Sequence, residues 1–300
     1  MTRRILLVAH PTRPEAVDVA RHVVKQLRAA DIEVALPPDE ARMFHGIDIG
    51  PVVEADPDDP TRGAELVVVL GGDGTILRGA EHSRGTDVPL LGVNLGHVGF
   101  LAEAEREEVP ATVDHIVNRA YQVEERMTLA VTVRHEGEAP YPCWALNEVS
   151  VEKAARERML EVAVEVDGKP LSAFGCDGIV IATPTGSTAY AFSLGGPVIW
   201  PDVEAILMVP NAAHALFARP VVVGPGSQLA VEVIPEAEGH GIMWCDGRRQ
   251  LELRPGARIE VGRSDVPVRL ARLSASPFTD RLVAKFDLST AGWRGNGRVR

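Results

Sequence analysis

The feature that most constrains the fold is an apolar run that ends in a glycine-rich turn. Leu66-Val67-Val68-Val69-Leu70 is followed directly by Gly71-Gly72-Asp73-Gly74-Thr75, and a segment of helical character, Ile76 to Ser83, comes next. A β-branched run bounded by glycines predicts a fully buried strand of a parallel sheet. Ligands of open α/β sheets bind at the carboxyl ends of such strands, so we expect a binding site at this turn.

The residues of this turn indicate contact with a phosphorylated ligand. Glycines let the main chain come close to a ligand and leave amide groups free to face phosphate oxygens. A phosphate repels a neighbouring carboxylate, so we expect Asp73 to contact a hydroxyl proton or a metal ion instead. The turn lacks the spacing of a P-loop and that of a dinucleotide-binding fingerprint. An ordinary strand-to-helix turn with an Asp-Gly pair remains the alternative interpretation.

The residues around this turn predict a doubly wound α/β domain over residues 1–125. Apolar residues from Ala16 to Leu27 recur with helical spacing, and apolar strand-like runs alternate with such helices. Asn94 to Leu101 follows another apolar run and holds two more glycines, which predicts a second loop at the same edge of the sheet. The predicted strands are residues 5–8, 32–36, 65–70 and 89–95, and the predicted helices are residues 16–27, 76–83 and 109–120.

Residues 37–63 interrupt this alternation with an acidic, proline-rich stretch. Its centre has the sequence Asp56-Pro57-Asp58-Asp59-Pro60. This composition predicts an exposed, mobile loop, and a loop of that kind beside a binding site can act as a lid.

In the second half of the chain the pattern changes to the period-2 alternation of antiparallel strands. Apolar residues of 160–166 alternate with polar or small ones and lead to an Asp-Gly turn. We therefore predict an antiparallel β-rich domain over residues 126–275, with one short helix near 187–193. The last segment, residues 276–300, is expected to pack back on the first domain and to fray at its end. Residues 278–288 are compatible with either helix or strand.

Three motifs of the second half carry polar groups of interest. Asn147 and Glu148 stand within an apolar strand, where a buried carboxylate is costly unless it is bonded, so Glu148 is a candidate ligand-binding group. Thr183 to Tyr190 holds five hydroxyl side chains, a donor surface suited to ribose and phosphate oxygens. A strand-end polar pair and a Ser/Thr-rich helix cap are the respective structural alternatives. Asp246 to Arg249 has the sequence of a hairpin turn.

The overall composition excludes several classes of protein. The 300 residues suit two domains, and the formal net charge of -11 argues against general nucleic-acid binding. No apolar run approaches the roughly 18 residues that a membrane helix needs. The N-terminus lacks the features of a signal peptide, and the three cysteines lack metal-binding spacing. We therefore expect a cytoplasmic protein with reduced thiols, bound neither to nucleic acid nor to a membrane.

Taken together, these motifs closely resemble those of bacterial NAD kinases, which are ATP:NAD 2′-phosphotransferases. The resemblance covers nearly the whole chain. The Gly-Gly-Asp-Gly-Thr element by itself is also similar to that of diacylglycerol and sphingoid lipid kinases and of phosphofructokinases, and Thr183 to Tyr190 separates the chain from those relatives. The segments that carry the resemblance are residues 71–75, 94–101, 147–148, 183–190, 193–197 and 210–216, followed by Arg219-Pro220.

The resemblance implies a role for each matching residue. Asp73 would act as the general base for the 2′-hydroxyl of the adenosine ribose of NAD, and the phosphates of ATP would be bound by Gly71, Gly72, Gly74 and Thr75. Asn147 and Glu148 would hold that ribose and the adenine region. Asp177 would reach the nicotinamide side, in the family often across a subunit boundary. The other NAD contacts that it implies are Gly74, Arg78, Phe100, Arg158, Thr185, Thr188, Ala189, Tyr190, Ser193, Ala212, Asp246 and Arg248.

The same resemblance implies ATP, or polyphosphate, as phosphoryl donor and a homodimer or homotetramer as the assembly. The sequence holds no carboxylate cluster with the character of a dedicated metal site, so we expect Mg²⁺ or another divalent cation to arrive with the nucleotide. Residues 37–63 and Asn211-Ala212-Ala213 depart from the family's usual pattern. Two other functions remain open, a lipid or sugar kinase of the same superfamily and a catalytically silent NADP-binding sensor.

Overall fold

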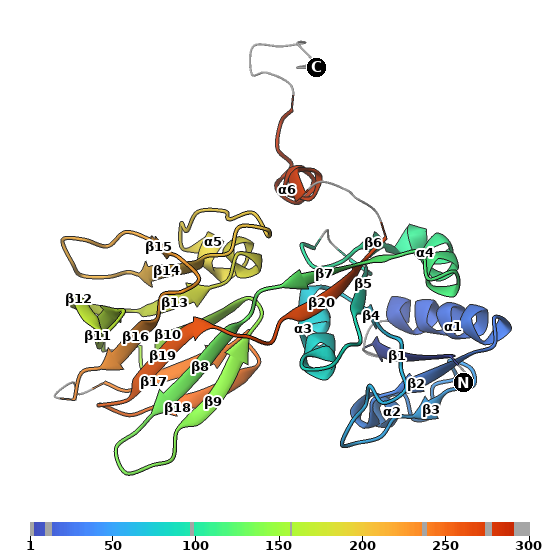
Figure 1. Ribbon diagram of the computed structural model, residues 1–300, viewed down its shortest axis with the longest axis horizontal. Helices are drawn as coiled ribbons and strands as arrows, with labels where there is room; N and C mark the ends of the chain where they lie inside the picture. The colour runs from blue at the N-terminus through green and yellow to red at the C-terminus, as the bar shows by residue number, and fades with distance from the viewer. Residues whose placement is uncertain are drawn as a thin grey trace. The chain divides into compact units, whose positions relative to one another are not determined.

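The computed structural model describes residues 3–9, 14–96, 99–156, 158–235, 239–273 and 278–290. The chain divides into two compact units (Figure 1). Unit 1 comprises Met1–Glu125 with Val268–Arg300, and unit 2 comprises Arg126–Pro267. The division at residue 267 differs from the predicted boundary at residue 275, because residues 268–272 form a strand that pairs with the sheet of unit 1.

Unit 1 is built on a largely parallel sheet. Its strands are β1 (Arg3–Ala9), β2 (Ile32–Leu36), β3 (Val53–Glu54), β4 (Leu66–Leu70), β5 (Leu90–Asn94), β6 (Ala104–Glu105), β7 (Gln122–Arg126) and β20 (Val268–Arg272). Their order among the described residues is β3-β2-β1-β4-β5-β20-β7, with β6 paired to β5. Because β2, β1, β4 and β5 pair in parallel, their carboxyl ends meet at one edge of the sheet.

Helices cover both faces of this sheet, which explains why its central strands are continuous apolar runs. Leu66, Val68 and Leu70 of β4 belong to one buried cluster with residues of two of these helices, α1 (Pro14–Ala29) and α4 (Val109–Val117). On the other face, Val69 lies so close to Gly79 of α3 (Asp73–Ser83) that a Cβ there would be 2.4 Å from its Cγ2 atom. The remaining elements are a 3₁₀ turn at Arg106–Glu108 and the helices α2 (Pro38–Met43) and α6 (Phe278–Phe286).

Residues 37–63 are more regular than their composition predicts. They contain α2 and β3, and Ala55 N donates a hydrogen bond to Leu36 O over 2.8 Å. Phe44, Ile49 and Ala55 are buried. The prediction of an exposed loop is therefore wrong for these parts, because apolar residues scattered among the acidic ones pack against unit 1.

The segment 278–288, for which the sequence left helix and strand open, begins with α6. Two aromatic residues of α6 pack against Phe100 of unit 1, with ring centroids 5.7 Å away for Phe278 and 5.9 Å away for Phe286. The predicted fraying falls on residues 291–300, which lie outside the described residues.

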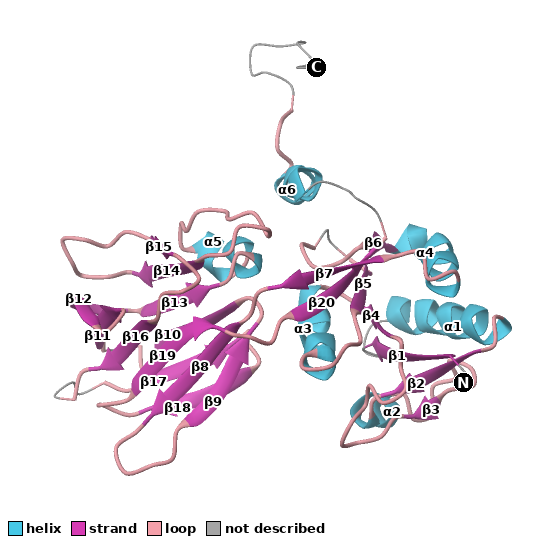
Figure 2. Cartoon of the chain, viewed as in Figure 1, coloured by secondary structure: helices cyan, strands magenta, loops and turns pink. Residues whose placement is uncertain are grey.

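Unit 2 consists of two antiparallel sheets (Figure 2). Among the described residues, one sheet has the order β15-β14-β13-β10-β17-β18 and the other the order β12-β11-β16-β19-β8-β9. Alternate residues of both sheets, such as Val149 and Val162, form a single buried cluster. The strands are β8 (Leu129–Arg134), β9 (Tyr141–Ala145), β10 (Glu148–Lys153), β11 (Leu160–Val166), β12 (Lys169–Cys176), β13 (Gly178–Ala182), β14 (Ile206–Asn211), β15 (Val221–Val223), β16 (Leu229–Val233), β17 (Gly241–Cys245), β18 (Arg249–Leu253) and β19 (Arg258–Arg263).

A short helical segment follows β13, near the position that the sequence predicts. It consists of a 3₁₀ turn at Thr185–Thr188 and the single-turn helix α5 (Tyr190–Ser193). Among the described residues, no helix of either unit is long and apolar enough to cross a membrane.

Candidate functional site

The glycine-rich turn joins the end of β4 to the start of α3. Gly71 N donates a hydrogen bond to Val93 O of β5 over 2.9 Å. Gly72 O accepts a bond of 2.8 Å from Thr75 N, which closes the first turn of α3. A Cβ on Gly71 would lie 2.5 Å from Oγ1 of Thr75, so only glycine fits at this position without displacing the helix start.

Asp73 is the first residue of α3, and the main chain of a second loop holds its carboxylate. Phe100 N donates to Oδ2 and Leu101 N donates to Oδ1, each over 3.3 Å. Both bonds exceed the usual length of about 2.9–3.0 Å, so the carboxylate oxygens keep capacity for a further donor. Because the side chain is only half-buried, a ligand hydroxyl can supply that donor.

A second carboxylate lies near Asp73 in unit 1. Asn94 Nδ2 donates to Glu105 Oε2 over 2.8 Å, and Asn94 is buried at the end of β5. Burial raises the pKa of Glu105, and the charges of Glu108, Glu107 and Asp73 raise it further against the bond from Asn94. Glu105 could not be predicted from the sequence, because it stands in an acidic run without a periodic pattern.

Arg78, an expected NAD contact, is already paired within unit 1. Its Nε lies 3.1 Å from Oε1 of Glu40 in α2, and its Nη2 donates to Ala9 O over 3.2 Å. The Glu40 side chain is 1% exposed, so this ion pair ties α2 to the second turn of α3. The structure therefore gives Arg78 a structural partner that the sequence did not reveal.

In unit 2, Asp246 holds the main chain of the Asn147-Glu148 motif. Its Oδ1 accepts bonds from Asn147 N (2.7 Å) and Glu148 N (3.3 Å). Its Oδ2 accepts bonds from Leu146 N (2.9 Å) and Arg249 Nη2 (2.7 Å). The side chain is 2% exposed, so the chain itself already occupies the carboxylate that was expected to contact NAD. Burial raises the pKa of Asp246, and the bonds from the three amides and the charge of Arg249 oppose that shift.

The turn that carries Asp246 has the geometry that its sequence predicts. Asp246 and Gly247 have φ values of 55° and 63°, and they connect β17 to β18. Two consecutive residues with positive φ form a tight turn, which Arg248 N closes by donating to Cys245 O over 3.0 Å, and Cys245 then pairs with Arg249. The hairpin aims the Asp246 carboxylate back at residues 146–148, a contact across about a hundred positions that no local pattern contains.

Glu148 is a buried carboxyl group whose ionisation is unfavourable. Burial raises its pKa to about 8, and the charge of Asp246 contributes, although the amide of Tyr190 bonds to it. Its Oε2 is buried and has no hydrogen-bond partner within the described part of the chain. An unsatisfied buried oxygen is costly, and functional sites are where such groups concentrate. Glu148 is therefore available to a ligand hydroxyl or amine.

Most hydroxyl groups of the segment 183–190 are already bonded within unit 2. Thr183 Oγ1 donates to Leu146 O over 2.6 Å, and Ser187 Oγ donates to Pro184 O over 2.7 Å. Thr188 Oγ1 donates to Thr185 O over 3.2 Å. Three of the five hydroxyls thus bond to main-chain carbonyls in or next to the turn, in keeping with the helix-cap alternative, and the Tyr190 hydroxyl is hydrogen-bonded to the Asn211 side chain.

Close packing brings this segment against the Asn147-Glu148 motif. A Cβ on Gly186 would lie 2.0 Å from Asn147 O, and Thr183 N donates to that same oxygen over 2.9 Å. Burial raises the pKa of Tyr190, and the charges of Glu152 and Glu148 add to this effect. Unit 2 therefore gathers an amide, two carboxyl groups and a phenol in one place.

Asp177 lies at the border of the same region. Its Oδ1 is 2.6 Å from Lys153 Nζ, and its N donates to Asn211 O over 3.0 Å. Its charge is one of those that raise the pKa of Tyr190. Ala189 is half-buried just before α5, and exposed positions are occupied by Arg158, Ser193, Ala212 and Arg248.

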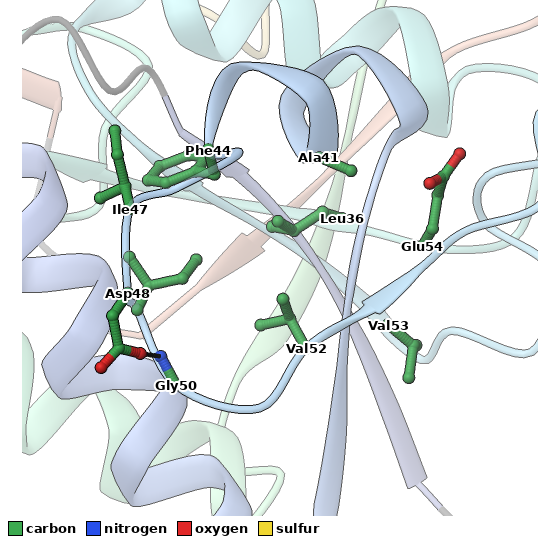
Figure 3. A pocket seen from close by; sticks show the side chains of 10 residues that line it. Leu36, Ala41, Phe44, Ile47, Asp48, Gly50, Val52, Val53 and Glu54 are labelled. Carbon is green, nitrogen blue, oxygen red and sulfur yellow. Dashed lines mark hydrogen bonds between the residues drawn. The ribbon is translucent and has the colours of Figure 1, made fainter.

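A separate pocket of about 270 Å³ lies beside α2, β2 and β3 (Figure 3). Its lining is mostly apolar, and its Asp48 carboxylate accepts a bond from Gly50 N over 2.9 Å. None of these described lining residues is among the expected site residues, and the pocket has no convergent free polar groups. We therefore do not assign it a ligand. In neither unit do the described residues contain a group of three or more His, Cys, Asp or Glu side chains that could hold a metal ion.

The chain joins an α/β unit to an antiparallel β unit, and comparisons with known proteins place it among the phosphotransferases. Two family models match the chain. The ATP-NAD kinase N-terminal domain covers residues 52–121, and the ATP-NAD kinase C-terminal domain covers residues 146–273. NAD kinase 2 of Streptomyces coelicolor is 59% identical over 295 residues, which are 98% of this chain and 97% of the relative. The chain belongs to the ATP-NAD kinase family.

Solved structures agree with this assignment. Yeast NADH kinase, crystallised with NADH, matches 97% of this chain and 89% of its own with a TM-score of 0.86 and 22% identity, which shows a shared fold. An NAD kinase from Archaeoglobus fulgidus, crystallised with ATP, matches 95% of this chain and 98% of its own with a TM-score of 0.72 and 25% identity. The family and the α/β plus β fold that the sequence predicts are confirmed.

Proposed function

We propose that this protein transfers the γ-phosphoryl group of ATP to the 2′-hydroxyl of the adenosine ribose of NAD, giving NADP and ADP. The observation that carries the proposal is the Asp73 carboxylate, which lies beside the glycine-rich turn with bonding capacity left for a hydroxyl. The name of the Streptomyces coelicolor relative, NAD kinase 2, supports the reaction, and the ATP complex of the archaeal relative supports the donor.

Asp73 acts as the general base in this mechanism. It orients the 2′-hydroxyl and accepts its proton as the hydroxyl oxygen bonds to the γ-phosphorus, while the bond from that phosphorus to the bridging oxygen of ADP breaks. A base of this kind typically contributes about 10²- to 10⁴-fold. The turn of Gly71, Gly72, Gly74 and Thr75 binds the triphosphate through the amides of Gly72 and Gly74, since those of Gly71 and Thr75 already bond to Val93 O and Gly72 O. Phosphoryl transfer depends mainly on such positioning and on charge neutralisation.

We assign the binding of NAD chiefly to unit 2. The unpaired Oε2 of Glu148 accepts a ribose hydroxyl, and Asn147 beside it contributes its side-chain amide. Tyr190, next to both, packs against the adenosine moiety, and Asp177 contacts the nicotinamide side. Further contacts that the family resemblance supports are Gly74, Arg78, Phe100, Arg158, Thr185, Thr188, Ala189, Ser193, Ala212 and Arg248. Asp246 holds Asn147 and Glu148 in place by accepting hydrogen bonds from their main-chain amides.

The divalent cation is not assigned to side chains of this protein. Because no three-ligand group occurs among the described residues, the donor set does not fit a resident metal site. We propose that Mg²⁺ arrives bound to the phosphates of ATP, and we assign no step to it.

We further propose a cytoplasmic homodimer or homotetramer. Leu216 and Phe217 expose large apolar side chains in unit 2, which supports an interface between copies. Free Cys143, Cys176 and Cys245 are in keeping with a reducing compartment. Light scattering on the purified protein measures the subunit number.

The test of the proposed function is turnover with NAD and Mg-ATP, read out by an NADP-specific dehydrogenase. The wild type is expected to make NADP, and Asp73→Asn is expected to lose most of kcat while its Kd for NAD stays within a few-fold. Asp18→Asn, an exposed carboxylate of α1, is the matched control. Near-native turnover by Asp73→Asn contradicts the base assignment.

Two further outcomes oppose the proposal as a whole. Tight NAD binding without product from either ATP or polyphosphate indicates a sensor of NADP instead of an enzyme. Absence of NAD binding points to a lipid or sugar substrate. Product from polyphosphate beside ATP extends the range of donors and leaves the reaction unchanged.

A further inference from the structure

We propose that Arg281 of α6 is a positioning residue for Asp73, acting through the main chain of residues 99–103. The inference rests on the function proposed above for Asp73, and it adds a contribution of the C-terminal helix to that site. All the groups involved belong to unit 1.

Phe100 links Asp73 to Arg281 through its main-chain N–H and C=O groups. Its N–H donates to Oδ2 of Asp73 over 3.3 Å, and its carbonyl oxygen accepts a bond of 3.3 Å from Arg281 Nη1. The same Nη1 donates to Ala102 O over 2.7 Å. One guanidinium group therefore fixes both sides of Leu101, whose amide is the second donor to Asp73.

Glu103 anchors the guanidinium to the sheet. Its carboxylate bonds to Nη2 of Arg281, to Nη1 of Arg272 in β20 over 2.7 Å, and to Leu273 N over 3.1 Å. The Glu103 side chain is 1% exposed, and a buried carboxylate requires such partners. The ion pairs are thus shielded from solvent, unlike surface pairs of little energetic consequence.

Aromatic packing places α6 over the same loop. The ring of Phe100 lies 5.7 Å from that of Phe278 and 5.9 Å from that of Phe286, at angles of 36° and 46°. None of the described residues of α6 is fully buried, and these ring contacts act together with the bonds of Arg281 to hold the helix on the loop. Arg281 extends this contact to the main chain that is bonded to Asp73.

The consequence for catalysis follows from the length of the Asp73 bonds. At 3.3 Å each, they are weak, so they orient the carboxylate only while Phe100 and Leu101 stay in place. Loss of the Arg281 bonds frees the carbonyls of Phe100 and Ala102 and allows this segment to shift. A misplacement of about 1 Å at a reacting group can cost on the order of 10²-fold in rate.

The experiment compares Arg281→Ala, Arg281→Lys and a matched control, Arg269→Ala. Arg269 also lies in unit 1 and also forms two ion pairs, with Asp87 and Glu125, but it does not contact residues 99–103. We expect Arg281→Ala to lower kcat roughly 10- to 100-fold with KM for NAD nearly unchanged. Arg281→Lys retains the charge and a single ammonium donor group in place of the forked guanidinium, so it is expected to recover part of kcat. Arg269→Ala is expected to keep the wild-type kcat.

Hydrogen exchange supplies a readout that does not depend on turnover. The amide protons of Phe100 and Leu101 are expected to exchange about tenfold faster or more in Arg281→Ala, and at the wild-type rate in Arg269→Ala. If the wild type makes no NADP, the proposed function fails, whereas the exchange rates still test the link between α6 and the loop.

Two results overturn the proposal. One is an Arg281→Ala protein whose kcat and amide exchange both match those of the wild type. The other is a loss of thermal stability in Arg281→Ala without any change of kcat below the unfolding temperature, because that pattern belongs to a purely structural residue. Should Arg281→Ala fail to fold, Arg281→Lys decides the question by the same two measurements.

Discussion

Gly99 packs directly against the carboxylate of Asp73. A Cβ on Gly99 would lie 2.4 Å from Oδ1, closer than a side-chain carbon can approach, and 3.2 Å from Oδ2. The amides of the next two residues, Phe100 and Leu101, donate to those same oxygens. The second glycine-rich loop therefore forms one wall of the Asp73 site, and a glycine there is a steric requirement.

Gly99→Ala is expected to displace the Asp73 carboxylate and to lower kcat by about 10-fold or more, with a smaller change of KM for NAD. The added methyl group cannot move aside, because Gly99 is itself buried. Steady-state kinetics measure the effect. Gly262→Ala, where a Cβ meets no atom within 4 Å, is the control, and equal kcat values for the two variants contradict the expectation.

Much of unit 1 could be predicted from the sequence because its signals are local. The run Leu66–Leu70 is apolar at every position, and β4 is buried on both faces, as such a run predicts. The start of α3 was less predictable. The helix begins at Asp73, three residues before the apolar periodicity begins at Ile76, because glycines and an aspartate at a helix start carry no periodic signal.

The features that the sequence did not reveal depend on contacts between distant residues. The segment from Phe278 to Phe286 is compatible with a strand as well as a helix in its local sequence. In the structure it is a helix, and the rings of both phenylalanines pack against Phe100, a contact with a residue about 180 positions earlier. Glu40 belongs to a stretch whose acidity predicts solvent exposure, yet it is buried because Arg78 lies 38 positions further on and pairs with it. Asp246 has the sequence of a plain hairpin turn, and its bonds to residues 146–148 depend on how β17 pairs with β10.

Glu148→Gln is expected to stabilise the protein at alkaline pH. The folded state raises the pKa of Glu148 from 4.5 to about 8, so it holds the proton more tightly than the unfolded chain does. Between these two values the wild type loses stability as the pH rises, by at most a few kcal/mol, and glutamine removes that loss.

Thermal unfolding at pH 6 and at pH 8.5 tests this expectation. The Tm advantage of Glu148→Gln should be larger at pH 8.5. Glu161→Gln replaces an exposed carboxylate of β11 and should show no such change. An equal Tm difference at both values would mean that burial does not hold the proton on Glu148.

Asp246→Asn is expected to raise KM for NAD more than tenfold and to destabilise the protein by about 1–3 kcal/mol. The side-chain NH₂ group of asparagine would face a main-chain N–H of residues 146–148 in either orientation, because both oxygens of Asp246 accept such bonds. Asp167→Asn is the control, since Asp167 also has a positive φ in an Asp-Gly hairpin turn, but it is exposed and bonds to residues 227 and 228. Matching KM values for the two variants would assign Asp246 to stability alone.

Cys143 is expected to be the cysteine that reacts first with iodoacetamide near neutral pH. A hydrogen bond from the Cys245 thiol lowers the pKa of Cys143, and Cys143 is half-buried in β9. Burial raises the pKa of Cys176 to about 12, which keeps that thiol protonated. Because the thiolate is the reactive form, we expect Cys143 to be alkylated at least about tenfold faster than the other two cysteines at pH 7.5, as measured by mass spectrometry of the tryptic peptides.

Cys245→Ala removes the donor and should slow the reaction of Cys143, whereas Cys176→Ala should leave it unchanged. Equal labelling of Cys143 in all three proteins would show that Cys245 does not stabilise its thiolate.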